Sequence, residues 1–139
     1  MHDYTTEIHI NAPADKVWDA LTDPQLLSQY LSDTSIDSDW QKGSAPHITH
    51  QWEGEVQEDK AVVLEAEPNK LLKLSYLPAL ADLPDTPDNY QQITATLAET
   101  DGHTLLRIEV LNIRDDFYGQ RAPELWGEIL GNIKKTIEG

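Results

Sequence analysis

Apolar and polar residues alternate at the start of the chain, and the spacing of the apolar residues then lengthens to that of a helix. The alternation predicts a half-buried strand over residues 3–10. The helical spacing that follows predicts a short amphipathic helix over residues 13–21. A second short helix is expected over residues 24–30, because the residue before Pro24 is disfavoured in helical conformation and separates the two.

The middle of the chain predicts an antiparallel series of strands. Alternating residues bounded by turn residues place the expected strands at 34–40, 47–52, 61–67, 71–76, 90–99 and 104–113. Residues 58–60 are predicted as a polar turn. Asp101-Gly102, between two alternating runs, is a strong signal for a tight hairpin.

Two further segments complete the pattern. Residues 77–88 contain three prolines and three aspartates and cannot form a central strand. The chain closes with a predicted helix over residues 123–137, whose apolar stripe comprises Trp126, Leu130, Ile133 and Ile137, broadened by Leu125 and Ile129. Gly127 and Gly131 lie one turn apart beside this stripe. Because a glycine costs about 1 kcal/mol in a helix, we expect backbone or a bound molecule to approach closely there. The resulting order predicts an α+β domain with a mostly antiparallel sheet.

Composition excludes several classes of site and partner. A chain of 139 residues is long enough for one domain with one hydrophobic core. It contains no cysteine, which excludes disulfides and cysteine-ligated metal sites. The formal net charge of −15 argues against nucleic acid and anionic membrane surfaces as partners, and solubility is its simplest interpretation. With no signal peptide and no membrane-spanning run in the sequence, we expect a soluble cytoplasmic protein.

The polar residues form no recognised catalytic or metal pattern. His47 and His50 are three residues apart in a predicted strand, so their side chains point to opposite faces and predict no metal site. The aspartates of residues 77–88 have neither the spacing nor the glycine of a calcium loop. We therefore predict neither a metal nor a cofactor. An enzyme built on this chain would depend on acid–base groups such as His50, Tyr76, Tyr90 and Asp116.

The motifs together resemble a known family. The predicted first strand and the Ala-Pro-Ala-Asp-Lys-Val-Trp-Asp-Ala-Leu-Thr-Asp-Pro motif of residues 12–24 are similar to the opening of the SRPBCC superfamily, also called START-like, Bet v 1-like or helix-grip proteins. Within it, the sequence is most similar to bacterial stand-alone relatives of the C-terminal domain of the activator of Hsp90 ATPase. The Gly43 turn, residues 63–76, residues 101–108 and the Trp126 helix extend the resemblance over nearly the whole chain.

The resemblance implies a helix-grip fold, in which a curved antiparallel sheet wraps around a long C-terminal helix and leaves a cavity between them. It implies a non-enzymatic protein that binds a small, largely apolar molecule in that cavity. The residues expected on the inward faces are Trp18, Leu27, Tyr30, Ile48, His50, Trp52, Leu74, Tyr76, Ile93, Leu106, Ile108, Val110, Trp126, Gly127 and Leu130. Residues 77–88 are expected to form a mobile rim over the cavity entrance.

Two other functions stay open. The family resemblance also implies a protein-interaction module that regulates a chaperone, although that role in the activator depends on a second domain. Relatives in the superfamily include cyclases, dehydratases and hydrolases, which leaves a metal-free enzyme as a third interpretation. An open apolar cavity would favour the binding protein, a filled cavity the interaction module, and paired polar groups inside an open cavity the enzyme. The ligand, the protein partner and the oligomeric state are not specified by the sequence.

Overall fold

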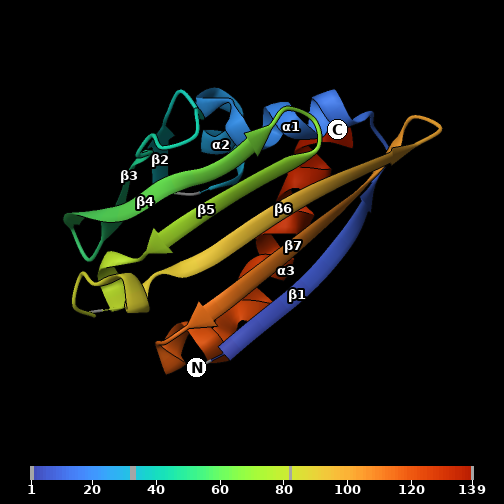
Figure 1. The fold of residues 1–139 in the computed structure, drawn as a ribbon. Coiled ribbons are helices and arrows are strands. Elements are labelled where there is room, and N and C mark those ends of the chain that lie inside the picture. The colour runs from blue at the N-terminus through green and yellow to red at the C-terminus, as the bar shows by residue number, and fades with distance from the viewer. Residues whose placement is uncertain (1, 32–33, 82, 139) are drawn as a thin grey trace.

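The computed structural model describes residues 2–31, 34–81 and 83–138, and for Tyr30 and Trp52 the backbone alone. This part of the chain forms a seven-stranded antiparallel sheet, curved around one long helix (Figure 1). The strands lie in the order β1-β7-β6-β5-β4-β3-β2. The elements are β1 (His2–Ile10), α1 (Ala14–Thr22), α2 (Pro24–Tyr30), β2 (Thr34–Asp37), β3 (His47–Trp52), β4 (Glu55–Glu67), β5 (Leu71–Leu77), the 3-10 helices η1 (Ala79–Ala81) and η2 (Pro87–Asn89), β6 (Gln91–Thr100), β7 (His103–Ile113) and α3 (Asp116–Glu138).

The hydrophobic core lies between the concave face of the sheet and α3. Along β7 every second residue from Thr104 to Val110 is buried, as expected for a strand with one face in the core. The core residues of this strand and of α3 are Leu106, Ile108, Val110, Ile113, Ala122, Leu130 and Ile133. Helix α3 packs mainly on β1, so the β3–β5 half of the sheet lies farther from it. The predicted α+β architecture, with a curved sheet wrapped around the C-terminal helix, is confirmed.

Helices α1 and α2 lie together at one end of the sheet (Figure 1). Asp23 separates them and caps the second, because its Oδ1 accepts a hydrogen bond from the Gln25 backbone N–H at 2.9 Å. The indole N–H of Trp40 donates to the Thr22 carbonyl at 2.8 Å and ties the loop after β2 to the end of α1. The break predicted between the two helices is therefore correct.

Two predicted strand boundaries are wrong. Residues 58–60 do not form a turn, because they lie inside β4, and the turn between β3 and β4 is at Glu53-Gly54, where φ is 50° and 81°. Because the buried residue at position 59 is polar, the alternation of apolar and polar residues that marks a strand is interrupted there. The strand predicted over residues 34–40 ends at Asp37, and Trp40 has a φ of 56°, which a strand does not accommodate.

The predicted start of the last helix is also wrong. Helix α3 begins at Asp116, so Pro123 is inside it rather than in its first turn. A proline removes one backbone hydrogen bond from a helix but does not always end it. The two additional turns matter for the site, because they place Phe117 and Tyr118 on the helix.

The connection between β5 and β6 is held by polar contacts. Asp85 accepts hydrogen bonds from the Lys60 ammonium group and, at 2.6 Å, from the Tyr90 hydroxyl. The Asn112 side-chain amide donates to the backbone carbonyls of Asp88 and Tyr90 at 2.8 and 3.0 Å. These contacts fasten Asp85, Asp88 and Tyr90 to β4 and β7 without strand pairing.

Candidate functional site

A buried carboxylate lies on the concave face of the sheet. Asp59 alternates along β4 with Glu58 and Lys60, which point outward, and its side chain is 4% exposed. Its Oδ2 accepts a hydrogen bond from the Tyr76 hydroxyl at 2.7 Å, and its Oδ1 accepts one from the Ala79 backbone N–H at 2.8 Å. Asp59 therefore joins β4, β5 and the start of η1 at one point.

The imidazole of His50 completes this polar cluster. Strand pairing places Ile48 opposite Asp59, so His50 is two residues further along the same inward face of β3. The His50 Nδ1 is 3.5 Å from the Asp59 Oδ2, and the His50 side chain is 16% exposed. At that distance the imidazole is a neighbour of the carboxylate rather than a strong hydrogen-bond partner. We call Asp59, Tyr76 and His50 the polar cluster.

The charge of Asp59 affects two tyrosines. Burial raises the pKa of Tyr76 well above its ordinary value, and the charge of Asp59 and the hydrogen bond to it act in the same direction. Burial, followed by the charges of Asp59 and Asp115, raises the pKa of Tyr118 to about 12. Both phenols therefore keep their protons at neutral pH. Because Tyr118 belongs to α3, the field of Asp59 reaches across from the sheet to the helix.

An open groove lies where Tyr118 faces η1. It encloses about 590 Å³ and is lined by Leu80, Phe117, Tyr118, Arg121, Glu124, Leu125 and Glu128. The Phe117 and Leu125 side chains are large and apolar, yet 51% and 40% exposed. The guanidinium carbon of Arg121 lies 3.8 Å from the centre of the Phe117 ring. We call this the α3 groove; its walls are mainly apolar and its charged groups are at the rim.

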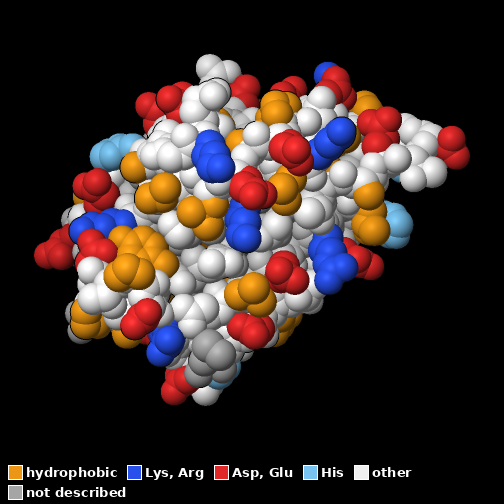
Figure 2. All heavy atoms as spheres, in the orientation of Figure 1, with side chains coloured by type: hydrophobic (Ala, Val, Ile, Leu, Met, Phe, Trp, Pro, Cys, Tyr) orange, Lys and Arg blue, Asp and Glu red, His pale blue; other side chains and the backbone are white. Residues whose placement is uncertain are grey.

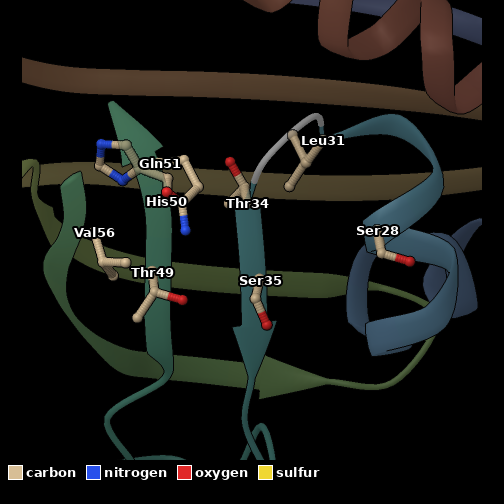
Figure 3. A pocket seen from close by; sticks show the side chains of 8 residues that line it. All are labelled: Ser28, Leu31, Thr34, Ser35, Thr49, His50, Gln51 and Val56. Carbon is tan, nitrogen blue, oxygen red and sulfur yellow. The ribbon is translucent and has the colours of Figure 1, made fainter. Parts of the chain in front are cut away.

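A second, smaller pocket lies between α2 and the β2–β3 edge of the sheet. It encloses about 350 Å³ and is lined by Ser28, Leu31, Thr34, Ser35, Thr49, His50, Gln51 and Val56 (Figure 3). Hydroxyl and amide groups make up most of this lining. His50 and Thr34 are directly opposite each other across the β2–β3 pairing. The polar cluster therefore borders this pocket through His50 and is electrostatically coupled to the α3 groove through Tyr118.

The sequence model of one protein family, described as Activator of Hsp90 ATPase homolog 1-like protein, matches residues 11–138. The chain belongs to this family. No functionally curated protein matches the sequence. Membership of the family supports a ligand-binding or interaction module in general terms, without a specific ligand.

Solved structures share the fold over nearly the whole chain. ChR145 from Cytophaga hutchinsonii is 29% identical, with a TM-score of 0.85 and coverage of 99% of this chain and 94% of that one. CV1439 from Chromobacterium violaceum is 20% identical, with a TM-score of 0.85 and coverage of 99% and 98%. A structure described as the Aha1 dimer from Colwellia psychrerythraea is 21% identical, with a TM-score of 0.76 and coverage of 99% and 97%. The last two likenesses concern the fold alone.

Most of the residues predicted to line the cavity lie inside the molecule. The fully buried ones are Leu27, Ile48, Leu106, Ile108, Val110 and Leu130. The partly buried ones are Trp18, His50, Leu74, Tyr76, Ile93 and Trp126. Gly127 is on the exposed face of α3, and the side chains of Tyr30 and Trp52 lie outside the described residues. Of the described set, His50 borders the smaller pocket, and ligand contact by the others stays a prediction.

The close approach expected at Gly127 and Gly131 is not found within the described part of the chain. A Cβ built on either glycine meets nothing within 4 Å. Gly119 has the close neighbour instead, since a Cβ there would collide with the imidazole ring of His2. Steric contact therefore explains the glycine at position 119 but not Gly127 and Gly131.

The acid–base groups named from the sequence do not all meet. Tyr76 and His50 share the polar cluster, but Tyr90 is bonded to Asp85 in the β5–β6 connection. Asp116 is at the exposed start of α3, where its Oδ1 lies 2.9 Å from the His2 Nε2. Of the four groups named from the sequence, Tyr76 and His50 thus lie together, beside Asp59.

Sequence reasoning missed Asp59, the central residue of the cluster. The available signal was its two-residue spacing from Ala61 and Val63, which continues the buried face of β4 back through the predicted turn. Sequence reasoning likewise started α3 too late to put Phe117 and Tyr118 on one helix face with Arg121. Their spacing of three and four residues was the signal for that face.

Two absences concern the described residues only. Residues 2–31, 34–81 and 83–138 contain no group of three or more His, Cys, Asp or Glu side chains arranged to hold a metal ion. In the same ranges, no helix combines the length and the apolar character needed to cross a membrane.

Proposed function

We propose that this protein binds a small, largely apolar molecule that enters through the α3 groove and lies between α3 and the β3–β5 half of the sheet. The observation that carries the proposal is the groove itself. Apolar pockets with a few convergent polar groups are the usual form of small-molecule sites. Phe117 and Leu125 both line the groove and are exposed two turns apart on α3, where a domain without a partner would gain by burying them.

The position of the groove supports this proposal. Its opposite wall is Leu80 of η1, and the residue before it, Ala79, is hydrogen-bonded to Asp59. A molecule seated against Leu80 and Tyr118 would therefore have its apolar body in the groove and its far end near the polar cluster. This arrangement gives one site both an apolar surface for affinity and polar groups for orientation.

A neutral apolar fluorophore, N-phenyl-1-naphthylamine, tests the proposal. We expect its fluorescence to rise on addition of the protein and Leu125→Ser to weaken binding about tenfold, because losing a buried leucine costs about 1.5–3 kcal/mol and 1.4 kcal/mol is tenfold in affinity. Leu105→Ser is the matched control, since Leu105 lies on the outer face of β7, between the buried Thr104 and Leu106, and outside both pockets. Absence of any binding, or equal weakening by both variants, would contradict the proposal.

An interaction module is the second candidate, and one observation favours it. Phe117 and Leu125 are exposed enough to contact another protein, and a structural neighbour is described as a dimer. Sedimentation velocity distinguishes the candidates: a dimer that Leu125→Ser converts to monomers would favour the interaction module. A monomer that binds the fluorophore would favour the small-molecule site.

A further inference from the structure

We propose that the molecule bound at this site carries a positively charged nitrogen, with Asp59 as its counter-charge. This inference rests on the proposed function and adds the chemical class of the ligand. It assigns a specific role to the polar cluster, which the family membership does not. The recognised group would be an ammonium attached to an apolar body.

The first support is the set of groups that contact Asp59. Its two described hydrogen-bond donors, the Tyr76 hydroxyl and the Ala79 backbone N–H, are both neutral. Each carboxylate oxygen can accept a further hydrogen bond beyond the one it receives. The nearest titratable nitrogen is the His50 Nδ1, at 3.5 Å from Oδ2. The carboxylate is thus held in place by neutral donors and keeps acceptor capacity for a cation.

The second support is the position of the lysine side chains that form ion pairs. Lys60 pairs with Asp85, and Lys134 pairs with Glu138, both at the surface. Within residues 2–31, 34–81 and 83–138, no lysine or arginine forms an ion pair with Asp59. Removing a charge from water without a partner costs several kcal/mol. An incoming ammonium group would recover part of that cost, whereas an incoming carboxylate would add to it.

The third support is the chemistry of the α3 groove, through which the ligand would approach Asp59. The rim of the α3 groove carries Glu124 and Glu128, and its wall presents the rings of Phe117 and Tyr118. Aromatic faces attract cations, and Arg121 already lies over the Phe117 ring. The field of Asp59 reaches Tyr118 in the same wall. Glu124, Glu128 and the Tyr118 ring favour passage of a cation over an anion, whereas the Arg121 guanidinium on the Phe117 ring opposes it.

The whole surface acts in the same direction. The formal net charge is −15, which attracts cations from solution and repels anions. On the outer face of the sheet, however, basic side chains lie among the acidic ones (Figure 2). The general charge therefore steers a cation towards the protein, while the buried Asp59 carboxylate, which pairs with no lysine or arginine of the described residues, distinguishes one site from the surface.

Three twelve-carbon probes that differ only in their end group test the inference: dodecylammonium, dodecanol and dodecanoate. Titration calorimetry at pH 7, below the concentrations at which the probes aggregate, gives their dissociation constants. We expect dodecylammonium to bind at least about tenfold more tightly than dodecanol, and dodecanoate to bind most weakly. In about 0.5 M NaCl the preference should persist, because salt screens surface charges far more than buried ones.

A pair of variants separates Asp59 from the general charge. Asp59→Asn should bring the affinities for dodecylammonium and dodecanol to within about threefold of each other. Asp116→Asn changes the net charge equally at a carboxylate that is 82% exposed, and should leave the preference unchanged. Thermal melting identifies a variant that does not fold, and the salt series on the unmodified protein then stands alone as the test.

The outcomes separate the two proposals. Equal binding of all three probes, tightest binding of dodecanoate, or a preference that disappears in salt would overturn the assignment of a cationic ligand and leave the apolar site standing. A preference that survives Asp59→Asn in a folded protein would overturn the role of Asp59. Failure of all three probes to bind would contradict the proposed function itself.

Discussion

At the scale of single residues, the glycines of α3 differ in whether a larger side chain would fit, and this difference predicts how alanine changes the stability of the fold. Gly127 and Gly131 are exposed, and an added Cβ would meet nothing, so alanine at either position should stabilise the helix by about 0.5–1 kcal/mol. Urea unfolding measures the change. Gly119→Ala is the control, because its Cβ would displace His2, and it should stabilise less or destabilise.

The opposite outcome for the exposed pair would be informative. A loss of stability in Gly127→Ala or Gly131→Ala would mean that something packs against this face of α3. Stabilisation combined with loss of probe binding would place a bound molecule there.

The hydrogen bonds of Asp59 predict unequal costs for two neighbouring variants. Asp59→Ala leaves the Tyr76 hydroxyl and the Ala79 N–H without their acceptor, and a buried group left unpaired costs about 1–3 kcal/mol. Tyr76→Phe removes one hydrogen bond and leaves the Ala79 contact in place. We expect Asp59→Ala to lower the free energy of unfolding by about 2–4 kcal/mol and Tyr76→Phe by about 1 kcal/mol. Equal costs in urea unfolding would show that the Ala79 contact contributes nothing.

Asp59 also shows why part of the site could not be predicted from the sequence. Local propensity assigns Glu58-Asp59-Lys60 to a turn, because three adjacent charged residues are typical of solvent. The burial of the middle residue depends on Tyr76, seventeen positions away, and on Ala79, twenty positions away, which sequence periodicity does not report. In contrast, Asp101-Gly102 was predictable, because positive φ at both turn residues follows from their own chemistry.

At the scale of elements, the β5–β6 connection combines anchoring with exposed backbone. The Ala79 amide is bonded to Asp59, whereas Asp85 depends on exposed partners, Lys60 and Tyr90. Solvent-exposed contacts of this kind open more readily than core strands. We expect amides of residues 83–88 to exchange with deuterium faster than those of β6 and β7, measured by mass spectrometry.

A ligand should change this exchange pattern locally. An apolar ligand seated against Leu80 should slow exchange at η1, because it would bury the exposed side of that turn. The ends of β6 and β7 next to the Asp101-Gly102 turn, at the opposite end of β7 from the start of α3, serve as the internal control. Slowing at η1 would support the predicted rim, and exchange that a bound ligand leaves unchanged would favour a plain surface loop.

Element positions were predictable where one face is consistently buried, as in β1, β6 and β7. Their alternation of buried and exposed residues matches the alternation of apolar and polar residues in the sequence. The start of α3 was not predictable in this way, because Pro123 is a helix-start signal that tertiary packing overrides. The exposed face of α3 that forms the groove wall follows from those additional turns.

At the scale of the whole molecule, three tyrosines make the stability of the fold depend on pH in the alkaline range. Burial first, then Asp59, raises the pKa of Tyr76 well above its ordinary value, and burial raises that of Tyr118 to about 12. The hydrogen bond to Asp85 raises the pKa of Tyr90 to about 12. Between pH 10 and about 12 the folded protein therefore keeps protons that the unfolded chain has lost.

Because the unfolded state then binds fewer protons, the stability of the fold should be independent of these tyrosines below pH 10 and should fall as the pH rises towards about 12. The part of the tyrosinate absorbance that Tyr76, Tyr90 and Tyr118 contribute should rise in step with loss of the circular dichroism of the folded state, rather than before it. Tyr118→Phe removes one of the three contributions and should make the loss of stability with pH less steep. If all tyrosines ionised near pH 10 while the circular dichroism of the fold persisted, Tyr76 would not be held as a donor to Asp59, and the polar cluster would lack the structure on which its role depends.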